Sequence, residues 1–258
     1  MNRYWPDLSR LVWRVFARHF LVFRKTWKVN LSFTFFEPLF YLAALGLGLG
    51  AYVQPIEGIP YLNYLAPGLV VASAMFATSV ECTYDTYVRM EYQKVYHAII
   101  ATPAGVDDVV MGDIVFGAFK SVLYGSIITL VVFAVGLIGS PWALLIPVVM
   151  AVSGLLIAAL SMTWTGLVPN IDSFNYFFSL IITPLYLFSG VFFPLAGMPG
   201  WVLKLAWFNP LYHTVNLTRG LATGGVGPWL AGDFAWLLIA ALLVIPLPLY
   251  LMRRLLIK

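Results

Sequence analysis

The sequence predicts an all-α integral membrane protein with six transmembrane helices, and three observations support that fold class. Hydrophobic residues occupy 61% of the 258 positions and charged residues only 10%. The mean hydropathy is +0.89. So few charges cannot cover a soluble globule, and lipid must therefore be the solvent for most of the chain. The single cysteine, Cys82, excludes disulfides within the chain and multi-cysteine metal sites.

The first segment, residues 1–31, is predicted to form a cytoplasmic amphipathic helix that lies in the membrane interface. Between Asp7 and Lys28, apolar residues recur at helical spacing and basic residues stay off that stripe. The cationic side of such a helix faces anionic headgroups. The alternative is a soluble helix packed on a partner. The apolar residues are Leu8, Leu11, Val12, Val15, Phe16, Phe20, Phe23 and Trp27, and the basic ones are Arg10, Arg14, Arg18 and Lys25.

Residues 32–258 are predicted to form one transmembrane domain. About 20 apolar residues are needed to cross roughly 30 Å of hydrocarbon, and six stretches are long enough. These stretches are residues 33–52, 61–82, 115–137, 142–168, 174–193 and 229–251. Four prolines inside the stretches are expected to kink the helices, namely Pro147, Pro184, Pro246 and Pro248.

The basic residues are distributed unequally, and their distribution predicts the orientation. Seven Lys and Arg residues precede residue 30, Arg89 and Lys94 follow the second stretch, and three more lie in the C-terminal tail. With six spans, all of these lie on one side, and the opposite side keeps Lys204 and Arg219. By the positive-inside rule both termini are cytoplasmic. Because the basic residues are dispersed among membrane segments, no nucleic-acid partner is predicted.

Two regions are predicted not to span the membrane. Residues 83–114 form a cytoplasmic loop that holds five of the eleven acidic residues and an apolar cluster at residues 95–100. Residues 194–228 are interrupted by Pro and Gly but rich in aromatic residues, which predicts two short helices that dip into the outer leaflet. Asn209 followed by Pro210 is typical of a helix start.

Several kinds of chemistry lack their sequence signatures. No phosphate-binding Gly-x-x-x-x-Gly-Lys-Ser/Thr loop is present, so we expect no ATP hydrolysis by this chain alone. His19, His97 and His213 lie in three separate regions, which favours solvated or interfacial histidines over a metal site. We therefore expect no metal and no catalytic residue.

Ionisable and aromatic residues at membrane depth are the candidates for a substrate path or gate. Glu37 and Glu81 lie in the same shallow cytoplasmic layer. Two roles are open for them: a part in substrate entry or gating, or structural pairing with Arg89, Lys120 or interfacial water. The other spans hold no acid or base for a proton relay, which indicates an external energy source. The aromatic candidates, for which ordinary packing is the alternative, are Trp164, Tyr176, Phe177 and Phe192.

The sequence ECTYDTYVRMEYQKVYHAIIATP at residues 81–103, followed by Gly112 and Asp113, resembles the ABC-2 type transport permeases. Within that family the chain is most similar to the export permeases for nodulation-factor lipo-oligosaccharides. Glu37-Pro38-Leu39 before the glycine-rich residues 46–50 resembles the first span of the family. Phe208-Asn209-Pro210-Leu211 resembles its outer segment, which makes Asn209 and Pro210 path candidates.

The resemblance implies a homodimer in a bacterial inner membrane, with two copies of a separate ATPase subunit beneath it. Those subunits would bind ATP and Mg, and this chain would bind no cofactor. Residues 94–103 would form the coupling helix that enters a cleft of the ATPase. Its contact residues would be Lys94, Val95, Tyr96, His97, Ile99, Ile100, Thr102 and Pro103. The chain would then export a lipid-linked saccharide or lipo-oligosaccharide from the inner leaflet.

Three other functions are compatible with the sequence pattern. A drug-efflux permease would share the same architecture. A membrane-embedded lipid transferase would need paired acids or a metal at the membrane face, for which Asp107 and Asp108 are the available residues. A structural scaffold would need neither an ATPase nor a substrate.

Overall fold

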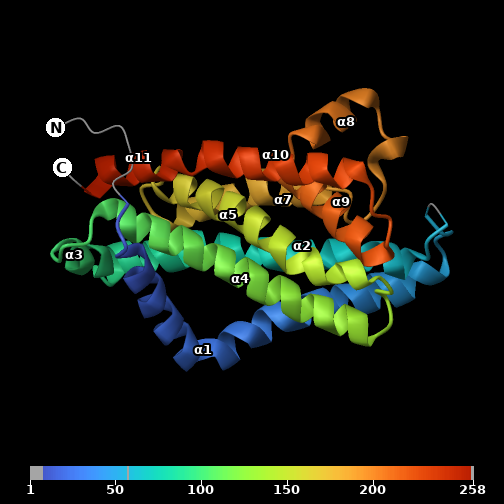
Figure 1. Ribbon diagram of the computed structural model, residues 1–258, viewed down its shortest axis with the longest axis horizontal. Helices are drawn as coiled ribbons and strands as arrows, with labels where there is room; N and C mark the ends of the chain where they lie inside the picture. Colours follow the sequence, from blue (N-terminus) through green and yellow to red (C-terminus); the bar gives the residue numbers. More distant parts are fainter. Residues whose placement is uncertain (1–7, 57, 257–258) are drawn as a thin grey trace.

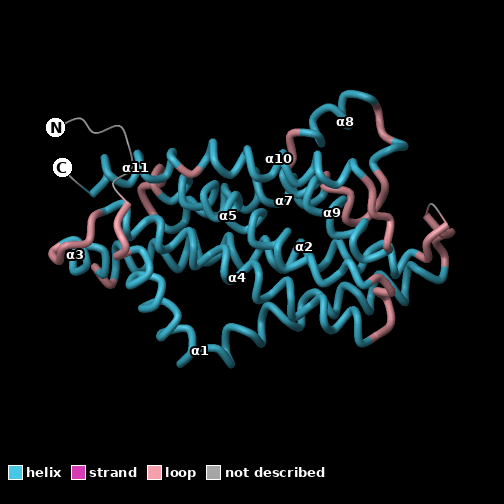
Figure 2. Tube along the Cα trace, in the orientation of Figure 1, coloured by secondary structure: helices cyan, strands magenta, loops and turns pink. Residues whose placement is uncertain are grey.

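The protein is helical throughout the part that the computed structural model describes, residues 8–56 and 58–256. Figure 2 shows helices joined by short loops. Among these residues the only extended pairing is an isolated antiparallel bridge between Ile56 and Ile59. The predicted all-α fold class is confirmed.

Among the residues that the structure describes, four helical runs are long and apolar enough to cross a membrane, and they lie side by side along the long axis of the molecule (Figure 1). They correspond to the second, third, fourth and sixth predicted stretches. The runs are Tyr61–Tyr92, Val106–Ala134, Pro141–Thr165 and Pro228–Leu256. Their elements are α2 (Tyr61–Val80) with η3 (Glu81–Asp85) and η4 (Val88–Tyr92), α4 (Val106–Ala134), η5 (Pro141–Leu145) with α5 (Ile146–Thr165), and α10 (Pro228–Val244) with α11 (Pro246–Leu256).

The first and fifth predicted stretches have a different form. Helix α1 (Val12–Tyr41) runs without a break across residue 31, bends along its length, and continues as the π-helix η1 (Leu42–Gly48) and the short η2 (Leu49–Ala51) (Figure 1). The fifth stretch follows η6 (Ile171–Ser173) and comprises α6 (Phe174–Phe177), η7 (Phe178–Ile182) and α7 (Thr183–Leu187). This run ends at Leu187, and its fourteen residues extend about 21 Å, less than the hydrocarbon thickness.

The acidic residues predicted in a cytoplasmic loop at residues 83–114 lie mostly on helices. The second run continues to Tyr92 and α4 begins at Val106, so only α3 (Val95–Ile100) and its flanks remain between them. The Asp108 carboxylate accepts a hydrogen bond from the Gly105 backbone amide, with a nitrogen–oxygen distance of 3.1 Å, and thereby caps the start of α4. Acids are also favourable in the first turn of a helix, where the backbone dipole is positive. Both helices therefore extend beyond their apolar windows.

Small residues bring the long helices close together. A Cβ atom at Gly112 of α4 would lie 2.6 Å from Val15 of α1, and one at Gly117 would lie 2.5 Å from the sulfur of Cys82. Gly154 of α5 similarly abuts Ser121 of α4. The absence of a side chain at these points permits backbone contact between helices in the membrane.

The ends of the described chain meet at one end of the bundle, beside α3 (Figure 1). The amide and hydroxyl of Ser9 donate to Asp108 at 2.7 and 2.9 Å. The Arg253 guanidinium pairs with Asp107. Asp107 and Asp108 therefore tie residues near both ends of the described chain to the start of α4. We refer to this end of the bundle as the inner end.

The opposite end carries two short helices, as predicted. They are α8 (Gly200–Trp207), preceded by the single turn η8 (Leu195–Gly197), and α9 (Pro210–Thr223). Asn209 is the N-cap of α9, and its side-chain oxygen accepts the Leu211 amide at 2.9 Å. The predicted helix start is confirmed. Figure 1 shows α8 projecting beyond the long helices.

The four prolines that were predicted to kink the helices lie where a helical run changes type or divides. Pro147 follows the 3-10 turn η5, Pro184 follows the π-helical turn η7, and Pro246 and Pro248 lie in the first turn of α11, where α10 has ended. The prolines inside long helices are Pro38 of α1 and Pro67 of α2. Neighbouring groups must compensate their missing hydrogen bonds.

Candidate functional site

Helix α3 lies outside the bundle at the inner end and has one exposed face and one buried face. Lys94, His97, Ala98, Thr102 and Pro103 are exposed. Val95, Ile99 and Ile100 are half-buried, and the two isoleucines pack against the hydrophobic cluster of the inner end. The exposed residues are therefore the ones that a partner protein can contact.

Tyr96 is the anchor of α3. Its side chain is completely buried, and its hydroxyl donates a hydrogen bond to the carboxylate of Asp113 on α4. Burial, and next the negative charge of Asp113, raise the pKa of Tyr96 well above its ordinary value. The hydroxyl thus stays protonated and remains a donor. The predicted coupling segment holds Tyr96 on its inner side, where the residue fixes α3 instead of contacting a partner.

Asp113 connects four elements. Besides Tyr96 of α3, it contacts His19 of α1, whose Nε2 lies 2.6 Å from Oδ1. Arg89 of η4 lies 3.5 Å from the same oxygen, and the Thr86 hydroxyl lies 3.5 Å from Oδ2. Asp113 has no solvent exposure, so these groups replace the water that an ionised carboxylate needs.

A second ion cluster lies beside Asp113, nearer the middle of the bundle. Glu81 is buried and pairs with Arg89 at 2.6 Å and with the Lys120 ammonium group. Asp85 lies 3.5 Å from the same ammonium. The alternative in which Glu81 pairs with Arg89 and Lys120 is confirmed. Lys120 is also buried and does not extend to water.

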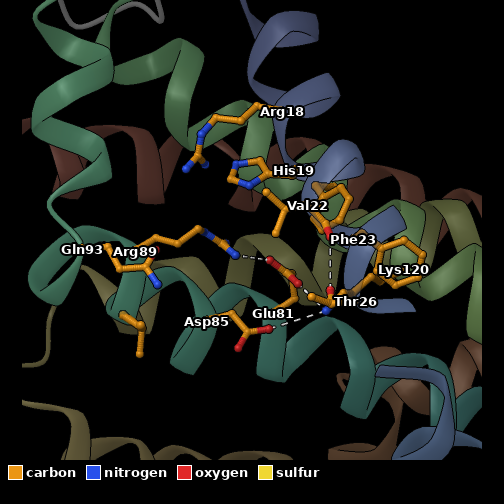
Figure 3. A pocket seen from close by; sticks show the side chains of 12 residues that line it. Arg18, His19, Val22, Phe23, Thr26, Glu81, Asp85, Arg89, Gln93 and Lys120 are labelled. Atoms are coloured by element: carbon orange, nitrogen blue, oxygen red, sulfur yellow. Dashed lines mark hydrogen bonds and ion pairs between the residues drawn. The ribbon is translucent and has the colours of Figure 1, made fainter. Parts of the chain in front are cut away.

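A cavity of about 310 Å³ opens between α1, the η3–η4 run and α4, and we call it the inner cavity. Figure 3 shows Arg18 and His19 extending from α1 toward Arg89 and Glu81 on its far side. Its lining also includes Lys120 and, on the apolar side, residues such as Phe23 and Phe116. The cavity thus has a charged part and a hydrophobic part.

The two candidates for the substrate path at the other end of the molecule are buried where α9 begins. Asn209 and Pro210 are buried, and the Asn209 amide nitrogen donates to the Leu185 carbonyl at 2.7 Å. Asn209 also reaches a mainly apolar groove of about 290 Å³ between α7 and α8. This residue ties the turn before α9 to α7.

The aromatic candidates do not form one path. Phe177 is buried, with its ring centre 5.7 Å from that of Trp164, and Phe192 stacks edge to face on Tyr186 at 4.9 Å. Tyr176 is exposed. The side chain of Glu37 lies outside the described residues.

Several buried polar residues were not predicted from the sequence. His19 was expected to be solvated or interfacial, but it is buried against Asp113. His213 is buried as well, with Nδ1 at 2.6 Å from Asp233 and Nε2 at 2.7 Å from the Trp207 carbonyl. A sequence signal for Asp113 did exist. Gly105 and the acid three positions later mark a helix start that places Asp113 two turns inside α4.

Comparison with known proteins gives a consistent family match. Residues 10–222 match the family described as ABC-2 type transporter. The chain is 32% identical over 243 residues to Nodulation protein J of Sinorhizobium fredii, a match that covers 94% of this chain and 92% of the relative. It is 36% identical over 216 residues to Nodulation protein J of Rhizobium leguminosarum bv. trifolii, covering 83% and 80%. Inner membrane transport permease YadH of Escherichia coli is 20% identical over 221 residues, covering 84% and 82%.

Proposed function

Because this chain belongs to the ABC-2 type transporter family, we propose that it is the permease subunit of an ATP-driven exporter whose ATPase is a separate polypeptide. Two copies of the permease pair as a homodimer above two ATPase subunits, which bind ATP and Mg. The cargo is a lipid-linked saccharide or lipo-oligosaccharide that moves from the inner leaflet outward. This cargo class rests on the resemblance to nodulation-factor export permeases, and the similarity to proteins named Nodulation protein J agrees with it.

The placement of α3 is the observation that best supports the coupling role. This six-residue helix stands at the inner end with His97, Ala98, Thr102 and Pro103 exposed, while Tyr96 binds it to α4. A helix so short is not stable alone, so its attachment to Asp113 gives it a fixed position. A partner that moves α3 thereby acts on α4, and through Asp113 on α1 and η4.

The membrane topology follows from the same proposal. The protein spans the inner membrane of a bacterial cell, with its inner end on the cytoplasmic side. The part of α1 before position 32 lies at the interface and continues into the first span at residues 33–52. Residues 174–193 complete six spans in the assembled transporter, as a helix shorter than the hydrocarbon followed by the turn at residues 188–193. Glu81 acts in this arrangement as a structural partner of Arg89 and Lys120.

Reconstitution into proteoliposomes tests the proposal. The permease and its ATPase are inserted together and supplied with three cargoes: an acylated oligosaccharide, the same oligosaccharide without its acyl chain, and a hydrophobic cationic drug. We expect ATP-dependent movement of the acylated oligosaccharide alone, and no ATP hydrolysis by the permease without its partner. Movement of the drug alone indicates an efflux permease. Transport without any ATPase contradicts the proposal.

A further inference from the structure

Arg18 is the Arg or Lys side chain of the inner cavity that makes no ion pair with the described residues, although Glu81 and Asp85 also line this cavity. Arg89 and Lys120, the other two cations in the lining, each pair with Glu81. The Nη1 atom of Arg18 is enclosed and has no hydrogen-bond partner among the described residues. The Arg18 side chain is only partly buried, so its guanidinium group keeps hydrogen-bonding capacity that the described residues do not fill and that an acceptor from outside the chain can use.

The electrostatic surroundings of Arg18 favour an anion as that acceptor. Burial, and next the positive charge of Arg89, lower the pKa of Arg18, and the negative charge of Asp113 opposes them only in part. A negative group between the two guanidinium groups would offset both effects. The Nε atom of Arg89 is likewise enclosed without a hydrogen-bond partner. Phosphate oxygens match the planar fork of donors that arginine presents.

The apolar residues of the lining point to a lipid as the source of the phosphate. Val22, Phe23 and Phe116 give the inner cavity a hydrophobic wall beside its charged part. Its volume of about 310 Å³ exceeds what one water molecule occupies by roughly tenfold. The α1 wall belongs to the amphipathic segment predicted to lie at the inner leaflet, where basic pockets between helices bind anionic headgroups.

We propose that the inner cavity binds the phosphate of an anionic phospholipid headgroup, held by Arg18 from α1 and Arg89 from η4. The hydrophobic wall receives the adjoining part of the lipid. A lipid in this position fastens the first half of α1 to the bundle beside the Asp113 contacts. This site is additional to export and does not depend on the identity of the cargo or of the ATPase.

Binding to the full chain purified in neutral detergent tests the proposal without any transport step. The probes are phosphatidylglycerol, phosphatidylcholine and inorganic phosphate, and native mass spectrometry measures their occupancy as a function of concentration. We expect saturable binding of phosphatidylglycerol that exceeds binding of the other two. Arg18→Gln removes a charge-assisted hydrogen bond and should weaken that binding by at least about tenfold.

Arg14→Gln is the matched control, because Arg14 is exposed one turn earlier on the same helix and does not line the inner cavity. It should change the binding by less than about twofold, since it alters only the diffuse surface charge. Equal losses in the two variants overturn the proposal in favour of general attraction to the cationic helix. Equal affinity for inorganic phosphate overturns the lipid assignment.

A conservative pair of variants covers the case in which Arg18→Gln does not fold. Arg18→Lys keeps the charge but loses the planar fork, so it should bind phosphatidylglycerol less tightly than Arg14→Lys does. Indistinguishable binding by these two variants contradicts the assignment of Arg18.

Discussion

Replacement of Tyr96 by Phe tests whether one buried hydrogen bond holds α3 in place. The substitution removes the hydroxyl that donates to Asp113 and keeps the ring, so no large cavity forms. Both side chains have no solvent exposure, and water cannot replace the lost donor. A hydrogen bond to a charged group contributes about 1.5–3 kcal/mol, which corresponds to a roughly 10- to 150-fold rise in the detached population of α3.

Hydrogen exchange measures this detachment directly. The backbone amides of Ala98, Ala101 and Thr102 donate to carbonyls within or beside α3, so they exchange when the helix opens. In Tyr96→Phe these amides should exchange at least about tenfold faster, while the amides of α5 keep their wild-type rates. Tyr92→Phe is the control, because Tyr92 is exposed on the neighbouring η4. Unchanged exchange in α3 would refute the idea that the Tyr96 hydroxyl anchors it.

Three further predictions concern the partner surface, helix packing and the outer end. Ala98→Asp, on the exposed face of α3, should leave the permease yield normal but lower the ratio of co-purified ATPase to permease. The reason is that the new carboxylate would be buried without a partner in the contact between α3 and the ATPase. An unchanged ratio removes this face of α3 from the interface. Gly112→Ala should lower the free energy of unfolding by about 1–3 kcal/mol and lower the thermal midpoint in detergent, since its Cβ would lie 2.6 Å from Val15. A wild-type midpoint would mean that α1 is loosely packed against α4 at this point. Asp233→Asn should retain stability, because the new amide can donate to Nδ1 of His213 while Nε2 of His213 donates to the Trp207 carbonyl. Asp233→Leu removes the partner of Nδ1 and should cost about 1–3 kcal/mol of unfolding free energy. Equal thermal midpoints for the two variants would show that the hydrogen bond between residues 213 and 233 contributes nothing.

The position of Ile99 makes it a poor site for a charged substitution that tests ATPase binding by the coupling segment. The sequence places Ile99 in an apolar cluster that a partner must cover, but the structure packs Ile99 and Ile100 partly against the chain's own inner cluster. A charge at Ile99 therefore disturbs the fold of the inner end as well as any interface. The exposed Ala98 separates these effects, because it has little packing to lose.

The membrane class, the start of α9 and the pairing of Glu81 were all predictable from the sequence. Hydrophobic length and composition are local properties, and lipid allows few alternatives to a helix. The Asn209-Pro210 start depends on one side chain and the amide two residues later. Glu81 had few basic residues at its own depth, which limited its possible partners to Arg89, Lys120 or water.

Only the tertiary structure decided how the inner end is built. Whether Tyr96 faces inward depends on Asp113, which belongs to the next helix, and the position of Asp113 depends on where α4 begins. The ties that fix this region join residues 99 and 146 positions apart, from Ser9 to Asp108 and from Asp107 to Arg253. Such pairs leave no periodic signal, because each polar side chain is placed by helices that pack elsewhere along their length. The chain by itself thus determines that helices form and cross the membrane, whereas packing determines which charges meet, since a buried charge is stable only where distant segments supply its partner.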